Sequence, residues 1–268
     1  MRTLLIFLAL IIYTTASGQD RDSLINQAME QYQNGNKLKA VEYLTALAEH
    51  YPNDSSYGKT LYNIAYIYDE LELTDFALSW YRAIFTRKII DNLPEYRFPD
   101  THLNLRHKAS HNIGHIYYNR KLYNEAAVYY ANSLHKYKYV SSSGTSRKKD
   151  EMQVATWLAD CYDKLNKPDS FYWVLLPHVL TSHPYSSNYI SERLLKKLPD
   201  SVARRSFQNE IDLALASAKK GKYDDYKMIF RGNEIVIEPY GDEYKSVTEF
   251  IKAVKQEEFY LGLTGAKK

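Results

Sequence analysis

The sequence predicts a mainly α fold that is made of a repeated helical unit and followed by a β-hairpin and a helix. Two further observations support the C-terminal part of this prediction. Alternating apolar and charged residues flank Gly232-Asn233, and one apolar stripe runs through residues 246–259. The repeat itself is visible as small residues twelve positions apart, namely Ala28 and Ala40, Ala65 and Ala77, and Gly114 and Ala126.

The first residues are typical of an export signal. Arg2 precedes an apolar run of ten residues from Leu4 to Tyr13, and Ala16-Ser17-Gly18 supplies small residues for cleavage near Gly18. The run is shorter than the roughly 20 apolar residues of a membrane-spanning helix, although an uncleaved anchor is the alternative. We therefore expect residues 1–18 to be a signal peptide, and an exported protein that is periplasmic or secreted. No later segment is apolar enough to cross a membrane.

Composition narrows the function classes. The formal net charge is +3, and basic residues alternate with acidic ones along the chain, which argues against a nucleic-acid-binding face. The longest basic run, Arg147-Lys148-Lys149, follows Ser141-Ser142-Ser143-Gly144 and is interpreted as a solvated loop. The single cysteine, Cys161, lies in an apolar helical pattern and is expected to be a buried core residue, with a reactive thiol as the alternative.

Around the small residues, larger apolar residues recur at helical spacing. Gly35-Asn36 marks a turn in the first copy, and Tyr68, Tyr81, Tyr117 and Tyr130 are expected in the core, where an aromatic ring fills space and leaves a polar tip. A fourth copy over residues 158–175 is weaker, because Phe171 stands where a small residue is expected. Its helix pair should pack at a different distance.

The segment from Asn112 to Tyr118, followed by Tyr123, Ala126, Tyr130 and Leu134, resembles a tetratricopeptide (TPR) unit, which is a pair of antiparallel helices in about 34 residues. The resemblance covers residues 23–184 and implies a helical-hairpin solenoid. We expect this solenoid over residues 19–187, with insertions around residues 91–104 and 141–151. Residues 188–268 form a separate C-terminal part.

In the C-terminal part, residues 189–198 and 201–219 are predicted helices, and Asp200 or Ser201 is a candidate cap. Residues 226–239 are a predicted hairpin with Gly232-Asn233 as a two-residue loop. That loop pairs Phe230 with Ile235 and Met228 with Ile237, and a helix over residues 246–259 should cover the apolar face. We interpret this part as the cap of the solenoid, with strand addition by a partner at the hairpin edge as the functional alternative.

Sequence patterns that would indicate a catalytic, nucleotide-binding or metal-binding site are weak. Gly58-Lys59-Thr60 resembles the end of a phosphate-binding loop, but Asn53 stands where another glycine is needed. His107, His111 and His115 lie on one helix, and the outer two are roughly 12 Å apart along its axis, too far for all three to share one metal ion. Two adjacent histidines with a loop ligand for zinc are the alternative. We expect no catalytic residue, metal or cofactor.

In the TPR family the first helix of each unit lines a concave face, along which peptides bind. Carried over to this chain, the resemblance implies a groove rich in tyrosine, histidine and asparagine. Its residues are Lys59, Tyr62, Asn63, Tyr66, Asp69, Lys108, His111, Asn112, His115, Tyr118, Asn119, Thr156 and Asp160. If His111 and His115 contact an anionic ligand, its affinity should rise as the pH falls through roughly 6.5.

The expected function is that of a non-enzymatic scaffold or adaptor of a bacterial envelope that binds a protein or peptide partner. The alternative is a component of an uptake system that binds an envelope glycan or small ligand, with Tyr62, Tyr66 and Tyr118 as stacking platforms. A hydrolase whose residues meet only in space is the third reading, because such sites leave little trace in sequence.

Overall fold

The computed structural model describes residues 20–89, 91, 103–180, 187–223, 225–239 and 244–265. Contacts divide the chain into two compact units, Met1–Ile116 and Tyr117–Lys268. The predicted signal peptide lies outside the described residues, as does most of the predicted insertion around residues 91–104.

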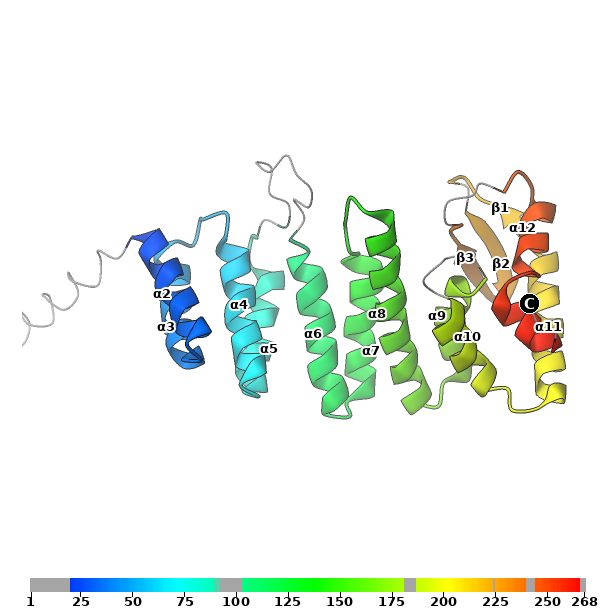
Figure 1. The fold of residues 1–268 in the computed structure, drawn as a ribbon, viewed down its shortest axis with the longest axis horizontal. Coiled ribbons are helices and arrows are strands. Elements are labelled where there is room, and N and C mark those ends of the chain that lie inside the picture. Colours follow the sequence, from blue (N-terminus) through cyan, green and yellow to red (C-terminus); the bar gives the residue numbers. More distant parts are fainter. Residues whose placement is uncertain are drawn as a thin grey trace, which may run out of the picture. The chain divides into compact units, whose positions relative to one another are not determined.

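Unit 1 consists of helices that pack on their neighbours in sequence. Their bounds are α2 (Arg21–Gln33), α3 (Lys37–His50), α4 (Tyr57–Glu70), α5 (Thr74–Thr86) and α6 (Leu105–Asn119), of which α6 continues into unit 2. Helix α2 packs on α3, α3 on α4, and α4 on α5 (Figure 1). Asp91 holds the start of α6, because its side chain accepts a hydrogen bond from the Leu105 backbone at 2.7 Å and pairs with Arg106 at 3.0 Å.

Unit 2 continues with helices and then a small sheet. Its helical segments are α7 (Tyr123–Ala131), a π-helix (Asn132–Lys136), α8 (Gly144–Lys164), α9 (Pro168–Leu175), a 3-10 turn (Leu176–His178), α10 (Ser187–Lys196) and α11 (Ser201–Ala216). The predicted loop around the basic run is wrong, because residues 144–151 form the first turns of α8. Ser143 caps that helix by accepting a hydrogen bond from the Ser146 backbone at 3.2 Å. The predicted cap of α11 is confirmed, since Asp200 accepts hydrogen bonds from the backbones of Val202 and Ala203.

The turns inside four helical hairpins share one backbone geometry. Their left-handed residues are Gly35 (φ 79°), Glu72 (φ 59°), Lys121 (φ 61°) and Asn166 (φ 53°). In each turn the next residue donates a backbone hydrogen bond to the carbonyl five residues back, as Leu73 does to Tyr68 at 2.9 Å. This bond is the mark of a Schellman motif, which satisfies carbonyls that a helix end leaves open. The hairpins are therefore local repeats of one another.

The small residues that mark the repeat are buried. Ala40, Ala65, Ala77 and Ala126 are 0% exposed, and Ala28 is 3% exposed. Each B-helix alanine follows the left-handed turn residue by five positions, and Phe171 follows Asn166 by the same distance. In the fourth hairpin, Phe171 therefore occupies the position at which the other hairpins have an alanine. The structure confirms the predicted fold class, which is helical hairpins followed by a C-terminal β-hairpin and helix.

The sheet of unit 2 is antiparallel, with strand order β1 (Lys219–Lys220), β2 (Tyr226–Phe230) and β3 (Asn233–Ile237). The predicted hairpin exists, but its predicted register is wrong by two residues. The loop is Arg231-Gly232, and Met228 pairs with Ile235 rather than with Ile237. Both loop residues have positive φ, 48° and 79°, which is the geometry of a type I′ turn.

Arg231 tolerates this strained turn because its side chain is held on neighbouring helices. Its guanidinium pairs with Glu210 of α11 at 2.6 Å and with Asp169 of α9. It also lies over the rings of Tyr172, Phe207 and Phe230, at 5.2 to 5.6 Å from their centroids. These contacts tie the hairpin loop to the helices behind it.

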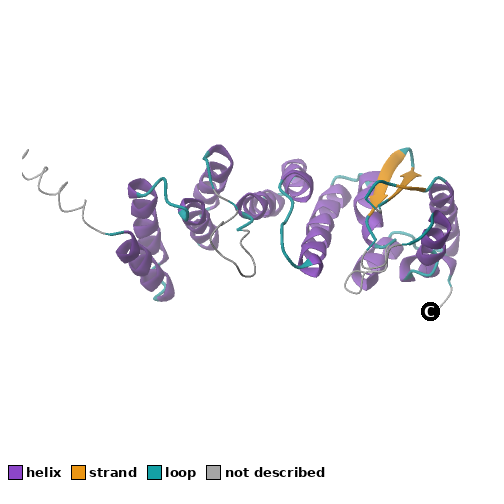
Figure 2. Cartoon of the chain, turned by 90° about the horizontal axis from the view of Figure 1, so that it is seen from above, coloured by secondary structure: helices purple, strands orange, loops and turns teal. Residues whose placement is uncertain are grey.

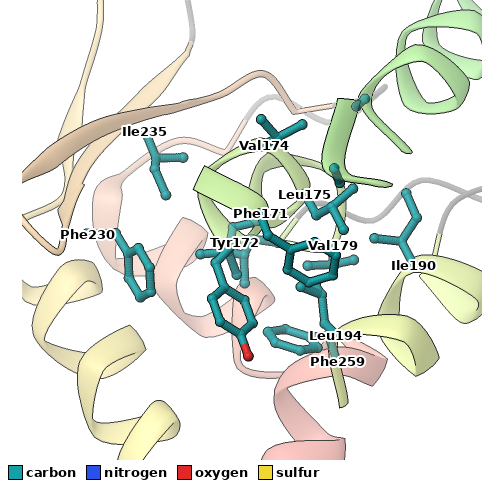
Figure 3. Packing of buried hydrophobic residues seen from close by; sticks show 14 of the residues in the cluster. Phe171, Tyr172, Val174, Leu175, Val179, Ile190, Leu194, Phe230, Ile235 and Phe259 are labelled. Carbon is teal, nitrogen blue, oxygen red and sulfur yellow. The ribbon is translucent and has the colours of Figure 1, made fainter. Parts of the chain in front are cut away.

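The C-terminal helix is divided into α12 (Val247–Val254) and α13 (Glu258–Thr264), where a single helix was predicted over residues 246–259. The bend turns Phe259 into a shared core, which also receives Phe171 and Tyr172 of α9, Ile190 and Leu194 of α10, and Phe230 and Ile235 of the hairpin (Figure 3). Seen from above, the strands lie beside the last helices of the chain (Figure 2). The sheet gains a buried face from this packing, which an isolated hairpin lacks.

Candidate functional site

A groove of about 450 Å³ opens in unit 1 between α2 and α4, with α3 beneath it. Its floor is apolar and is formed by side chains from all three helices. Ile25 and Ala28 come from α2, Leu44 and Leu47 from α3, and Ile67 from α4. Hydrophobic floors with few polar groups at the rim are typical of ligand-binding clefts.

Three large side chains on the walls of this groove are open to solvent. Met29 is 56% exposed, Tyr32 is 37% exposed and Tyr66 is 43% exposed, and all three line the groove. Their ring and thioether surfaces remain available for contact because no described element covers them fully. Exposed aromatic and methionine side chains at a concave surface are typical of protein recognition.

At one end of the groove the two basic side chains differ in their partners. Arg21 pairs with Asp54 at 2.7 Å and with Asp22 at 2.8 Å. The guanidinium of Arg21 lowers the pKa of Asp54 to about 2, so the pair is ionised at neutral pH. Lys59 is exposed and forms no ion pair with any residue in the described part of the chain. The free positive charge at this end is therefore that of Lys59.

The other end of the groove is closed by a hydrogen-bonded group. The Tyr32 hydroxyl donates to Glu70 at 2.9 Å, and Lys37 pairs with the same carboxylate at 3.2 Å. The charge of Glu70 also raises the pKa of Tyr66. This group joins α2, α3 and α4 and leaves the end of the groove neutral overall.

Lys59, Asn63 and Tyr66 are the residues of the expected list that line this groove. They are spaced four and then three positions apart, so they form a single stripe on α4 that faces α2. Arg21, Met29 and Tyr32 of α2 complete the groove and were not on the list. The expected groove residues included none from the first repeat copy, although the same helical spacing selects Ile25, Met29 and Tyr32 on α2.

Tyr62 and Asn112 face each other instead of a ligand. The Asn112 side-chain amide donates to the Tyr62 hydroxyl at 3.1 Å and to the Tyr81 hydroxyl at 2.8 Å. These two bonds use both hydrogens of the amide, so Asn112 joins α4, α5 and α6. Asn112, which the resemblance placed in the peptide-binding groove, therefore has a structural role in this unit.

The other expected residues of unit 1 lie away from the α2–α4 groove. Asp69 is half-buried, and burial raises its pKa. Lys108, His111 and His115 are half-buried on α6, and the rings of His111 and His115 are 5.8 Å apart. Burial, followed by the neighbouring histidines, lowers the pKa of His111 to about 3, and burial lowers that of His115. The expected increase of affinity near pH 6.5 therefore has no basis in His111, which stays neutral there.

The remaining expected residues belong to unit 2. Tyr118 packs edge-on against Tyr123 at 5.3 Å, and Asn119 is exposed. Thr156 is 6% exposed, and its hydroxyl donates to the Met152 carbonyl at 2.9 Å. Asp160 forms an ion pair with Arg193 of α10. Thr156 and Asp160 thus make internal contacts that hold α8.

The sequence Gly58-Lys59-Thr60 has a packing explanation. A β-carbon at Gly58 would lie 2.9 Å from Leu105 and 3.1 Å from Ile89, so a glycine lets the start of α4 approach these residues. The Thr60 hydroxyl donates to the Ser56 carbonyl at 3.2 Å. The turn that precedes α4 is not a glycine-rich phosphate loop.

Within the described ranges, no three histidine, cysteine, aspartate or glutamate side chains gather as metal ligands would. In the same part of the chain, no helix combines the length and the apolar character needed to cross a bilayer. The fold and the groove define a helical-hairpin protein with an apolar-floored groove between α2 and α4. No known family model matches the chain, and no curated protein matches it either.

Proposed function

We propose that this chain is an exported, TPR-like scaffold that binds a peptide segment of a partner protein in the α2–α4 groove. The observation that carries the proposal is the stripe of Lys59, Asn63 and Tyr66 above an apolar floor. The equivalent turns at Gly35, Glu72, Lys121 and Asn166 support the TPR resemblance. The signal-like residues 1–18 support export, and a bacterial envelope is the compartment that we propose.

The groove suits a short segment with two kinds of side chain. A volume of about 450 Å³ accommodates a few side chains, and the apolar floor between Ile25 and Ile67 favours aliphatic or aromatic ones. The Lys59 ammonium, which has no ion-pair partner among the described residues, favours a carboxylate. The Asn63 amide is able to hydrogen-bond a peptide backbone. The partner segment is therefore expected to be apolar with an acidic residue at one end.

The exposed rings favour a peptide over a glycan. Tyr66 is the one of the three expected stacking tyrosines that lines the groove, with 43% of its surface exposed. Tyr62 stacks against Tyr66 with 6.4 Å between the ring centroids, and its hydroxyl accepts a hydrogen bond from the Asn112 amide, so its ring is covered on one side. Tyr118 belongs to unit 2. Of these three tyrosines, a sugar ring would therefore be able to stack only on Tyr66 in this groove, and the floor beside Tyr66 is apolar.

Photocrosslinking from the groove tests this proposal. A photoreactive amino acid at Met29, which is 56% exposed in the groove, would be used to trap partners in a native envelope extract. The trapped peptide would then be identified, synthesised and titrated against the purified chain. The variant Lys59→Glu/Tyr66→Ser should bind it about tenfold or more weakly, since the variant reverses the free charge and removes an exposed ring.

Leu38→Ser is the matched control, because Leu38 is 56% exposed on α3 and does not line the groove. This control should bind the synthetic peptide as tightly as the unaltered chain. Equal binding by all three proteins would contradict the groove as the site. Trapping of a glycan in place of a peptide would support the alternative function.

A further inference from the structure

A second groove, of about 390 Å³, lies in unit 2 along the outer edge of β3. One wall is formed by β3 from Glu234 onward and by Glu238, which follows the strand. The opposite wall is formed by His135, Lys138 and Glu151, and Trp173 and Pro177 of the α9 region also line the groove. Because the strand order is β1-β2-β3, β3 is an edge strand of its sheet.

The register shows which backbone groups of β3 face this groove. Phe230 and Asn233 close the two-residue loop, so they form a hydrogen-bonded pair, and every second pair along the hairpin does the same. Glu234 and Val236 lie in the alternate pairs, and their backbone groups point away from β2. Two side-chain contacts agree with this assignment. Ile229, opposite Glu234, donates its amide outward to Ser217 at 2.8 Å, and the Glu234 carbonyl accepts from the Trp173 indole at 3.1 Å.

The hydrogen bond from Trp173 satisfies only the Glu234 carbonyl on the outer edge of β3. Its indole N–H takes the place that the amide of a neighbouring strand would have at Glu234. Two residues further on, the backbone N–H and C=O of Val236 form no hydrogen bond to any described residue. An edge strand with open backbone groups is a template for pairing with another chain. The open length is short, so an added strand would pair at Val236 and beside it.

The side chains of the edge suggest what the added strand carries. Glu234 and Val236 are exposed on one face of β3, Glu238 is exposed just past the end of the strand, and Val236 is 40% exposed. Lys227 already neighbours Glu234 at 3.3 Å, whereas Glu238 forms no ion pair with any residue in the described part of the chain. Cross-strand neighbours on one face are favourable when both are apolar or when their charges are opposite. The edge therefore matches an apolar residue opposite Val236 and a basic residue opposite Glu238.

We propose that the groove along β3 binds an extended segment of a partner protein, which adds to the sheet as a fourth strand and places an apolar and a basic residue two positions apart. Backbone hydrogen bonds to Val236 supply the register, and the charge of Glu238 selects the basic residue. Trp173 limits the length of pairing at the loop end of the strand. This site is in unit 2 and is independent of the groove between α2 and α4.

The test uses the purified chain and a defined probe, the peptide Gly-Thr-Val-Thr-Lys-Thr-Gly, with a second peptide in which glutamate replaces lysine. Amide resonances are followed by NMR during titration. The Val236 amide should shift and become protected from hydrogen exchange with the lysine peptide. The glutamate peptide should bind about threefold more weakly, as the cross-strand charge pair predicts.

Val236→Pro removes the outward N–H without breaking the ladder to β2, because proline is tolerated at such edge positions. It should weaken binding of the lysine peptide by about tenfold or more, while Val236→Thr, which keeps the amide, should bind normally. Equal binding by Val236→Pro with an intact hairpin would overturn the proposal. If the Val236→Pro variant fails to fold, the Glu238→Lys variant tests the proposal instead, through its preference between the two peptides. Reversal of the preference between the two peptides supports the proposal, and an unchanged preference or shifts confined to α2 and α4 overturns it.

Discussion

The Asn112 side chain donates a hydrogen bond to the Tyr81 hydroxyl across 2.8 Å, and this contact joins α6 to the buried side of α5. Tyr81 is 0% exposed, and burial raises the pKa of its hydroxyl. Its polar end therefore depends on a protein partner. The same amide also reaches Tyr62, so one side chain links three helices of unit 1.

Replacing Asn112 by leucine should lower the free energy of unfolding by about 1–3 kcal/mol, because the Tyr81 hydroxyl would stay buried without a partner. Tyr81→Phe alone should cost about 1 kcal/mol, and the double variant should cost less than the sum of the two. Urea unfolding of the four proteins measures this cycle. Additive costs would show that the two side chains do not depend on each other.

The helical hairpins were predictable from the sequence because the small residues of the repeat occupy regularly spaced buried positions. Ala40, Ala77 and Ala126 are all fully buried at equivalent positions. The turns were harder to predict, because only Gly35 and Asn166 are residues that a left-handed conformation favours. Glu72 and Lys121 adopt the same conformation without such a signal. Here the packing of the flanking helices determines the backbone, and the local preference gives way.

Glu72→Gly and Lys121→Gly should each raise the free energy of unfolding by about 0.5–1 kcal/mol. Glycine adopts positive φ without the cost of about 1 kcal/mol that a side chain incurs. Thermal unfolding measures the change. Glu42→Gly, at an exposed position inside α3, is the matched control and should lower stability by about 1 kcal/mol. A loss of stability at Glu72 or Lys121 would contradict the equivalence of the turns.

The hairpin register could not be predicted because two alternatives place the same residues on the core face. A shift of two positions leaves Met228, Phe230, Ile235 and Ile237 pointing inward, so the alternation of residues fits both. The choice depends on the loop, where Arg231 is held by Glu210 and Asp169 from helices distant in sequence. Contacts of that kind leave no local pattern.

The candidate site was predicted in part for a similar reason. The TPR resemblance placed Lys59, Asn63 and Tyr66 on the ligand-facing side of α4, where the groove lies. The same reasoning included Tyr62, which is turned toward Asn112 and Tyr81. Helical spacing shows which residues share one face of a helix. It does not show which of these residues the neighbouring helices cover.

Cys161 should be unreactive in the folded chain. Its side chain is 0% exposed, and burial raises the pKa of the thiol to about 12, so little thiolate forms at neutral pH. A thiol reagent such as 5,5′-dithiobis(2-nitrobenzoate) should label the chain only when urea unfolds unit 2. Rapid labelling in the absence of urea would instead favour the reactive thiol that the sequence left as an alternative.

His111 should make the chain less stable in acid. Burial lowers the pKa of His111 to about 3, whereas an unfolded histidine has an ordinary pKa of about 6.5. The unfolded state therefore binds an extra proton below pH 6.5, and the stability that the neutral side chain contributes is fully present above this value. It is lost progressively as the pH falls from about 6.5 toward 3, by about 1.4 kcal/mol per unit when one proton is involved.

The comparison of the unaltered chain with His111→Gln at pH 7.5 and pH 5.0 isolates this effect. Urea unfolding should show that the unaltered chain loses about 2 kcal/mol more between these values than the variant does, because glutamine does not titrate. His115 contributes in the same direction and remains in both proteins, so the difference reports on His111. His50→Gln, at an exposed position at the end of α3, is the control and should lose stability as the unaltered chain does. Parallel losses in the unaltered chain and His111→Gln would mean that His111 is protonated as readily in the folded chain as in the unfolded one.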